Sequence, residues 1–389
     1  MSHGDLGTGT EATGAARSVG SVPRSAFAGD EESLSDAETV LELDGLTRSY
    51  GVEDAVSDFS LAVRDGELLT LLGPSGCGKT TTLRLIAGLE RPSVGEVRLD
   101  GDEVAGGESF VPPEARDVGL VFQDFALFPH LTVQENVTFG IEDWDRARSE
   151  ERAEELLELV GLLDHREKTP DQLSGGQKQR VALARSLAPE PEVLLLDEPF
   201  SNLDVRLRIE MREEVRRILK ATGVTAISVT HDQEEALSIS DRVAIMNDGR
   251  LEQVGKPEVV FENPESRFVA SFLGRASFIS GRVRGETVET ELGVFDTAQL
   301  NGPVSAYDGA EIDVLVRPDD LEAIPSNRAA ADGQVVHRQY NGPTFVYRVE
   351  LESGTSVRCL HNHAETFEHG QNVTVDIAAD HSLAWYPRG

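Results

Sequence analysis

Gly73-Pro74-Ser75-Gly76-Cys77-Gly78-Lys79-Thr80 is the stretch that decides the fold of this chain. It fits the pattern G-x-x-x-x-G-K-[ST], whose glycines let backbone N–H groups wrap phosphates at a helix N-terminus. An apolar run at residues 67–72 precedes it, and residues 81–89 continue at helical spacing. The sequence therefore predicts a strand, a phosphate-binding loop and a helix, with the charge of Lys79 on the β and γ phosphates and the hydroxyl of Thr80 on Mg²⁺.

Two further segments stand downstream in a fixed order. Residues 173–177 read Leu-Ser-Gly-Gly-Gln, and residues 193–199 form an apolar run that ends in Asp197 and Glu198. We read that run as a buried strand with two carboxylates at its end. Adjacent carboxylates can divide two tasks: Asp197 can hold Mg²⁺ through water, and Glu198 can act as the general base on an attacking water.

With these motifs in place, residues 40–274 resemble the nucleotide-binding subunit of an ABC transporter. The resemblance implies an α/β P-loop NTPase fold with a helical subdomain, and ATP with Mg²⁺ as cofactors. It also implies a homodimer or pseudo-dimer, because Ser174, Gly175, Gly176 and Gln177 would bind the γ phosphate of the nucleotide held by the other protomer. By the same resemblance the phosphate loop and Thr81 bind the nucleotide of their own protomer.

Four other residues take their expected roles from the same resemblance. Gln123 would sense Mg²⁺ and the attacking water, and His231 would contact the γ phosphate and orient Glu198. Asp204, at the end of the Ser-Asn-Leu-Asp segment 201–204, would lie at the dimer interface, although the same segment fits a plain helix N-cap. Tyr50 would stack on adenine. A packing aromatic at Tyr50 and a structural histidine at His231 are the alternative interpretations.

Composition restricts the compartment and the partners. The formal net charge is -33, the acids are spread along the whole chain, and only five lysines occur. Such a surface suits concentrated salt, where screening reduces self-repulsion, so we expect a halophilic archaeal source. Nucleic-acid binding needs a basic footprint and is not expected. Cys77 and Cys359 are too few for a disulfide framework, and we find neither a spanning helix nor a signal peptide in the sequence.

The chain divides into three predicted parts. Residues 1–38 are expected to be a disordered acidic extension, and residues 39–274 to be the ATPase domain, with its helical subdomain at about 124–186. Residues 275–389 alternate in short runs broken by Gly, Pro and Asn-Gly, which predicts an all-β region. That region resembles the OB-like transport-associated (TOBE) domain of importer subunits. Dimer support is the role we favour for it, ahead of sensing an anion. His361 and His363 are interpreted as a surface loop rather than a metal site.

The resemblance to importer subunits implies an ATPase at the cytoplasmic face of the cell membrane, held there by integral membrane permease subunits and served by an extracellular solute-binding protein. Residues 123–140 resemble the segment that receives a permease helix in the subgroup for inorganic ions, polyamines and related solutes. Phe200, where polyamine and sugar subunits more often carry Leu, favours ferric iron. Polyamine, molybdate or tungstate, sulfate, thiamine and sugar stay open as solutes, as do a soluble non-transport ABC ATPase and a regulatory binding module.

Overall fold

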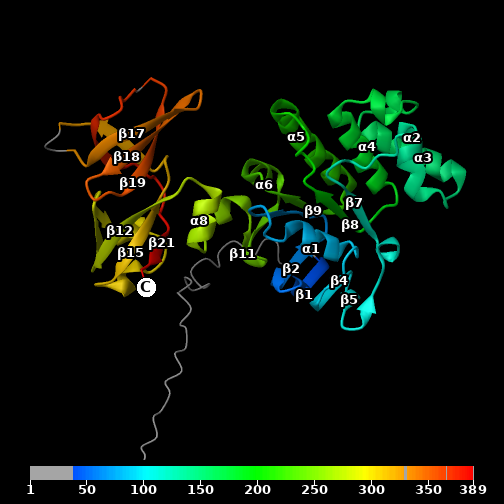
Figure 1. The fold of residues 1–389 in the computed structure, drawn as a ribbon, viewed down its shortest axis with the longest axis horizontal. Coiled ribbons are helices and arrows are strands. Elements are labelled where there is room, and N and C mark those ends of the chain that lie inside the picture. The colour runs from blue at the N-terminus through cyan, green and yellow to red at the C-terminus, as the bar shows by residue number, and fades with distance from the viewer. Residues whose placement is uncertain (1–37, 328–330, 365, 389) are drawn as a thin grey trace, which may run out of the picture.

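The computed structural model describes residues 38–327, 331–364 and 366–388 (Figure 1). Apart from Glu38, the predicted disordered extension lies outside these residues. Within them, an α/β domain is followed by an all-β domain, as the sequence predicts. No helix in the described parts of the chain is both long and apolar enough to cross a membrane.

A six-stranded sheet in the order β11-β10-β3-β9-β8-β7 forms the centre of the first domain. The strands from β10 to β7 pair in parallel, and only β11 is antiparallel. Their bounds are β3 (Leu68–Leu72), β7 (Val118–Val121), β8 (Val193–Asp197), β9 (Thr225–Thr230), β10 (Arg242–Asn247) and β11 (Arg250–Gly255). Because the carboxyl ends of parallel strands meet at one edge of a sheet, the segments that follow β3, β7, β8 and β9 are brought together there.

Both faces of the central sheet are buried, which explains why its strands are continuous apolar runs. Leu195 packs with the antiparallel sheet β2-β1-β4-β5-β6 and with α1 (Lys79–Ile86). Leu194 and Leu196 pack on the opposite face with the helices that follow in the chain. The bounds of the second sheet are β1 (Thr39–Tyr50), β2 (Glu53–Arg64), β4 (Val94–Leu99), β5 (Asp102–Gly106) and β6 (Ser109–Phe110).

The helical layer on that opposite face lies at the right of Figure 1. It consists of α2 (Val133–Thr138), α3 (Arg146–Leu159), α4 (Gly175–Leu187) and α5 (Val205–Thr222). Charged and apolar residues recur at helical spacing from Ala147 to about Leu163, but α3 ends at Leu159. Gly161, with φ of 65°, donates its N–H to the Glu158 carbonyl, and this left-handed glycine ends the helix.

The short helix α6 (Gln233–Ile239) connects β9 to β10, and two further short helices, α7 (Pro257–Glu262) and α8 (Arg267–Leu273), lead from β11 to the C-terminal domain. That domain, at the left of Figure 1, has two five-stranded sheets, β14-β13-β12-β15-β21 and β16-β20-β17-β18-β19, which share one apolar core. The bounds of its strands are β12 (Ser277–Arg284), β13 (Thr287–Thr290), β14 (Gly293–Asp296), β15 (Glu311–Val316), β16 (Leu321–Pro325), β17 (Gly333–Tyr340), β18 (Thr344–Leu351), β19 (Ser356–Asn362), β20 (Asn372–Ile377) and β21 (Trp385–Pro387).

The two domains meet at a polar junction beside α8. Asp313 on β15 is almost fully buried and forms ion pairs with Arg267 of α8 and with Arg388. The hydroxyl of Tyr386 donates to the carbonyl of Pro264 at 2.8 Å. Because a buried charge that loses its partner is costly, these contacts fix the C-terminal domain against the end of the ATPase domain.

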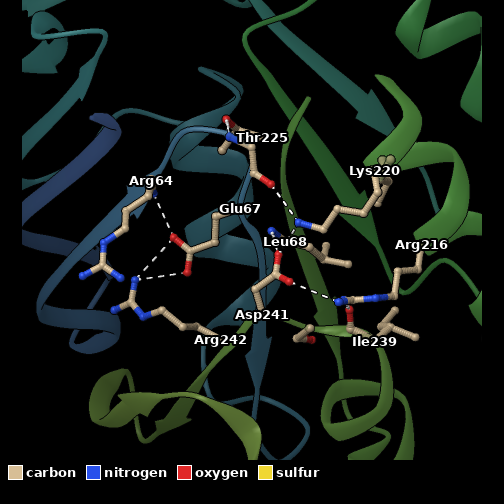
Figure 2. Close-up of polar contacts among 12 residues, drawn as sticks. Arg64, Glu67, Leu68, Arg216, Lys220, Thr225, Ile239, Asp241 and Arg242 are labelled. Atoms are coloured by element: carbon tan, nitrogen blue, oxygen red, sulfur yellow. Dashed lines mark hydrogen bonds and ion pairs between the residues drawn. The ribbon is translucent and has the colours of Figure 1, made fainter. Parts of the chain in front are cut away.

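A second polar network stands at the amino end of the central sheet (Figure 2). Asp241, just before β10, accepts hydrogen bonds from the Lys220 ammonium at 2.6 Å and from the Leu68 N–H at 2.8 Å. Glu67 is buried beside it and pairs with the Arg242 guanidinium at 3.2 Å. The network joins the start of β3 to the last turn of α5. It therefore fixes the strand that precedes the phosphate loop relative to α5.

Candidate functional site

The phosphate-binding loop lies between β3 and α1, as its sequence predicts. At Gly78 the backbone has φ of 102°, and a Cβ there would stand 2.1 Å from the carbonyl oxygen of Ala55. A Cβ at Gly73 would stand 2.2 Å from the carbonyl oxygen of Met246. Neither position accepts a side chain, so these glycines let β2 and β10 press against the loop.

The charge of Lys79 sits in the middle of this loop. Its side chain is buried, and Nζ donates to the carbonyls of Gly73 at 2.8 Å and Pro74 at 2.9 Å. Ser75 and Gly76 at the loop tip are exposed, whereas Cys77 is buried below them. Burial raises the pKa of the Cys77 thiol, which therefore stays neutral. Thr80 and Thr81 lie in the first turn of α1, which begins at Lys79.

Asp197 ends β8 opposite that helix. Its Oδ1 accepts from the Thr80 hydroxyl at 3.4 Å. Burial, together with the adjacent Glu198 carboxylate, raises the pKa of Asp197. A hard cation would relieve this unfavourable charge, and a carboxylate beside a hydroxyl is the oxygen donor set that Mg²⁺ prefers. The residues therefore fit the metal that the sequence predicts.

Glu198 lies between the segments that follow β7 and β9. The Nδ1 atom of His231 lies 3.0 Å from Oε1 of Glu198, and the Nε2 amide of Gln123 lies 3.5 Å from Oε2. The structure thus brings together all three residues that the sequence singles out as catalytic. The φ of Glu198 is 45°, in the left-handed region that a non-glycine residue occupies at a cost of about 1–3 kcal/mol.

The loop after β8, residues 201–204, contacts the backbone of two of these residues through hydrogen bonds that the sequence analysis missed. The Ser201 hydroxyl donates to the carbonyl of Glu198 at 2.9 Å, and the side-chain amide of Asn202 donates to the carbonyl of Gln123 at 2.8 Å. Asp204 is exposed and caps α5, accepting from the Leu207 N–H at 3.1 Å. The N-cap interpretation of this segment is therefore present in the structure, and its exposed side is free for other contacts.

The Leu-Ser-Gly-Gly-Gln segment stands apart from the phosphate loop of its own chain. Ser174 is exposed and caps α4 in a reciprocal pair with Gln177. A Cβ at Gly176 would come to 3.1 Å from Leu207 and Met211, so the helix start packs closely on α5. Among the described residues, no hydrogen bond or ion pair joins this segment to residues 73–80.

Tyr50, the predicted adenine contact, lies at the end of β1 and is about half exposed. Its hydroxyl donates to the Glu90 carboxylate. The guanidinium of Arg48 lies over its ring, 4.8 Å from the centroid. One face of the ring is therefore occupied by Arg48, and the structure leaves the role of Tyr50 as a prediction.

The interpretation of His361 as part of a surface loop is wrong. His361 lies on β19 and is buried, and its Nε2 accepts from the Ala323 N–H at 3.0 Å. Its ring also packs edge-to-face with the ring of Phe367, with 5.0 Å between the two ring centroids. The residues of β19 alternate between core and solvent, and this register places His361 in the core and leaves His363, beyond the strand, exposed.

Comparison with known proteins agrees with this geometry. Residues 56–201 match the ABC transporter family, and residues 314–385 match the TOBE domain family. The chain is 43% identical to the putrescine transport ATP-binding protein PotG of Escherichia coli (strain K12), over 82% of this chain and 86% of that protein. It is 40% identical to the Fe(3+) ions import ATP-binding protein FbpC of Agrobacterium fabrum (strain C58), over 86% of this chain and 94% of that protein.

Among solved structures, the chain resembles cbiO1 from Clostridium perfringens, part of the ABC transporter complex cbiONQ. The TM-score is 0.53 and the sequence identity 29%. The match covers 59% of this chain and 92% of that one.

Proposed function

The chain belongs to the ATP-binding subunits of importer-type ABC transporters that carry a C-terminal TOBE domain, and from this premise we propose that it drives solute uptake through a separate permease. The chain is an ATPase. We assign ATP hydrolysis to residues 39–274, with the helical subdomain at about 124–186, and dimer support to residues 275–389. The observation that carries the proposal is the meeting of Gln123, Glu198 and His231 beside the phosphate loop.

The residues divide the chemistry among them. Lys79 neutralises the β and γ phosphates, and the loop amides orient them. Glu198 accepts the proton of the attacking water, and His231 and Gln123 hold its two carboxylate oxygens in position. Thr80, Asp197 and Gln123 would hold Mg²⁺, which supplies positive charge to the phosphates. Tyr50 stacks on the adenine ring in this proposal.

A second copy completes each site. Ser174, Gly175, Gly176 and Gln177 are held away from the phosphate loop of their own chain, with Ser174 exposed to a partner. We therefore propose a head-to-tail homodimer or pseudo-dimer in which this segment contacts the γ phosphate across the interface, with Asp204 beside it. The dimer works at the cytoplasmic face of the membrane with integral permease subunits and an extracellular solute-binding protein.

The solute belongs to the permease, and we propose ferric iron, with polyamine as the second candidate. Relatives named for Fe(3+) import and for putrescine transport have similar identities to this chain, which supports both. The preference for ferric iron is based on Phe200. This side chain is buried in the core, so it contributes to packing and does not contact a solute. The complex reconstituted in vesicles with its permease and solute-binding protein decides between them: ferric ion or putrescine should stimulate ATP hydrolysis, and stimulation by neither contradicts both.

We also propose that the protein works in concentrated salt and comes from a halophilic archaeon, because it carries a net charge of -33. The Debye length falls from about 10 Å at 0.1 M salt to about 3 Å at 1 M. ATPase activity should be negligible in dilute buffer and recover in molar KCl. Highest activity at low ionic strength contradicts this part of the proposal.

The transport function is tested by purifying the tagged full-length chain from membranes of its own organism. Co-purification of a permease and loss of solute uptake in a strain that carries Glu198→Gln support an importer. A chain that hydrolyses ATP but co-purifies with no membrane protein contradicts the importer assignment and favours the soluble ATPase.

A further inference from the structure

Helix α5 carries a line of basic side chains spaced four residues apart: Arg208, Arg212, Arg216 and Lys220. Residues four apart share one face of a helix. All four side chains pair with acids at the two ends of α6, namely Asp232 before its first turn and Asp241 after its last. This basic line therefore docks α5 along the whole length of α6.

Arg208 is the member of the line that contacts the loop 201–204. Its Nη1 donates to Oδ2 of Asp232 at 3.3 Å, and its Nη2 donates to the carbonyl of Leu203 at 3.3 Å. Leu203 lies in the loop 201–204, which is bonded to Glu198 and Gln123 through Ser201 and Asn202. Arg208 thus joins that loop directly to the segment that follows β9.

Asp232 is the residue next to His231 and is held at three points. Its N–H donates to the Thr230 hydroxyl at 3.1 Å, and its Oδ1 accepts from the Glu235 N–H at 3.2 Å. Its Oδ2 receives Arg208 and, at 2.6 Å, Arg212. The His231 side chain is itself more than half exposed and contacts Glu198. These bonds fix the backbone next to His231, whose imidazole contacts Glu198.

We propose that Arg208 is a positioning residue for ATP hydrolysis, which transmits the placement of loop 201–204 through Asp232 to His231 and Glu198. A second chain would cover the exposed side of this loop, including Asp204, together with the exposed residues Val205 and Ile209 of α5. Closure of the dimer would then fix the positions of both the loop 201–204 and His231, because the Arg208 guanidinium connects them. The inference rests on the proposed function, because it concerns the step that Glu198 carries out.

The test compares full-length Arg208→Gln with the wild type in molar KCl. Glutamine keeps much of the side-chain length but loses the charge and the fork that bonds two acceptors at once. The kcat for ATP hydrolysis should fall by about tenfold to a hundredfold, as expected when reacting groups are displaced slightly. The KM for ATP should stay within about twofold, because Arg208 is remote from the phosphate loop and adenine contacts.

Two control variants remove a charge from the same helix. Arg206→Gln deletes an exposed arginine that pairs with Glu210 on the same helix, and it should leave kcat unchanged. Lys220→Gln breaks the far end of the basic line, about 18 Å along the helix from Arg208. It should lower the melting temperature without lowering kcat, which separates loss of positioning from general loosening of α5.

A double-mutant cycle with Asp232→Asn identifies the route. Asparagine retains the N-cap and removes the charge that Arg208 binds. If Arg208 acts through Asp232, the double variant is no slower than the slower single variant, whereas independent effects multiply. Wild-type kcat in Arg208→Gln, equal losses in Lys220→Gln, or multiplying effects would each overturn the inference. An inactive wild type would instead overturn the proposed ATPase site.

Discussion

The acids at the two ends of the central sheet have opposite electrostatic surroundings. At the amino end Glu67 and Asp241 meet Arg242, Arg216 and Lys220 (Figure 2). Burial raises the pKa of Asp241, but hydrogen bonds from Lys220 and the Leu68 N–H outweigh it, so that the net shift is downward. At the carboxyl end, burial and the neighbouring Glu198 raise the pKa of Asp197.

This contrast indicates that the acids at the amino end of the sheet have a structural role and those at the carboxyl end a functional one. Glu67 and Asp241 are paired with basic side chains, so they hold strands and helices together and are not available to bind a cation. Asp197 contacts the neutral hydroxyl of Thr80, and Glu198 contacts an amide and an imidazole, so both carboxylates keep capacity for a cation and a water. A carboxylate with a raised pKa, such as Asp197, is typical of functional sites. The comparison predicts that changes at the two ends will have different consequences.

The largest effect is expected for Glu198→Gln at the carboxyl end. The amide keeps the shape of the side chain but accepts no proton from water. ATP turnover should fall by at least about a hundredfold, the scale of a lost general base, while ATP binding persists. ATP-bound dimers should live longer and become visible by size exclusion. Near-normal turnover would remove Glu198 from its assigned role.

Lys79→Ala, at the same end, should act on binding. Removing a charge-assisted contact of about 1.5–3 kcal/mol weakens nucleotide affinity by roughly tenfold to a hundredfold. Titration with a fluorescent ATP analogue measures this, with Glu198→Gln as the matched variant that retains affinity. Equal affinity in Lys79→Ala and wild type contradicts the phosphate-loop assignment.

Glu235→Gln extends the comparison to a third kind of acid. Glu235 on α6 is buried, and its carboxyl group accepts a hydrogen bond from the Thr230 hydroxyl. Its pKa is raised to about 8, mainly by burial and also by Asp232, against the opposing effects of the Thr230 hydrogen bond, Arg212 and Arg208. The wild type therefore loses stability as the pH rises from about 4.5 through 8, because only the unfolded chain ionises freely in that range.

Glutamine at this position carries no such penalty. Between pH 6 and pH 8 the wild type should lose on the order of 2 kcal/mol more stability than Glu235→Gln. Melting temperatures of both proteins at fixed molar KCl measure the difference. Parallel pH profiles would show that Glu235 does not stay protonated in the folded chain.

The smallest effect is expected at the amino end. Asp241→Asn keeps an acceptor for the Leu68 N–H but weakens the pairs with Arg216 and Lys220. These pairs are partly exposed, so the loss of stability should be about 1 kcal/mol. The KM for ATP and kcat should be those of the wild type. A large loss of turnover without loss of stability would show that the two ends are not separate.

The sequence predicts the site better than it predicts the supports of the site. The phosphate loop and the strand that ends in Asp197 and Glu198 follow from local patterns, and the roles expected of Gln123 and His231 follow from the resemblance to the family. The left-handed backbone at Glu198 and the bonds from loop 201–204 do not, because they depend on which strands become neighbours.

Two features could have been found from spacing alone. The four-residue interval of Arg208, Arg212, Arg216 and Lys220 marks one face of a helix, although the acids that they meet come from another element. The alternation of Val357, Cys359 and His361 already places the histidine on the core side of a strand. The partner of each remains a matter of tertiary structure.

The measurement that tests the central claim most directly mixes two inactive chains in molar KCl. Lys79→Ala lacks a working phosphate loop, and Ser174→Arg lacks a working signature segment. A mixed dimer holds one site with an intact loop and an intact opposing segment, so the mixture should regain ATPase activity, and wild-type activity should rise more than linearly with protein concentration. No recovery on mixing, with wild-type activity linear at all dilutions, would contradict a site completed by a second chain.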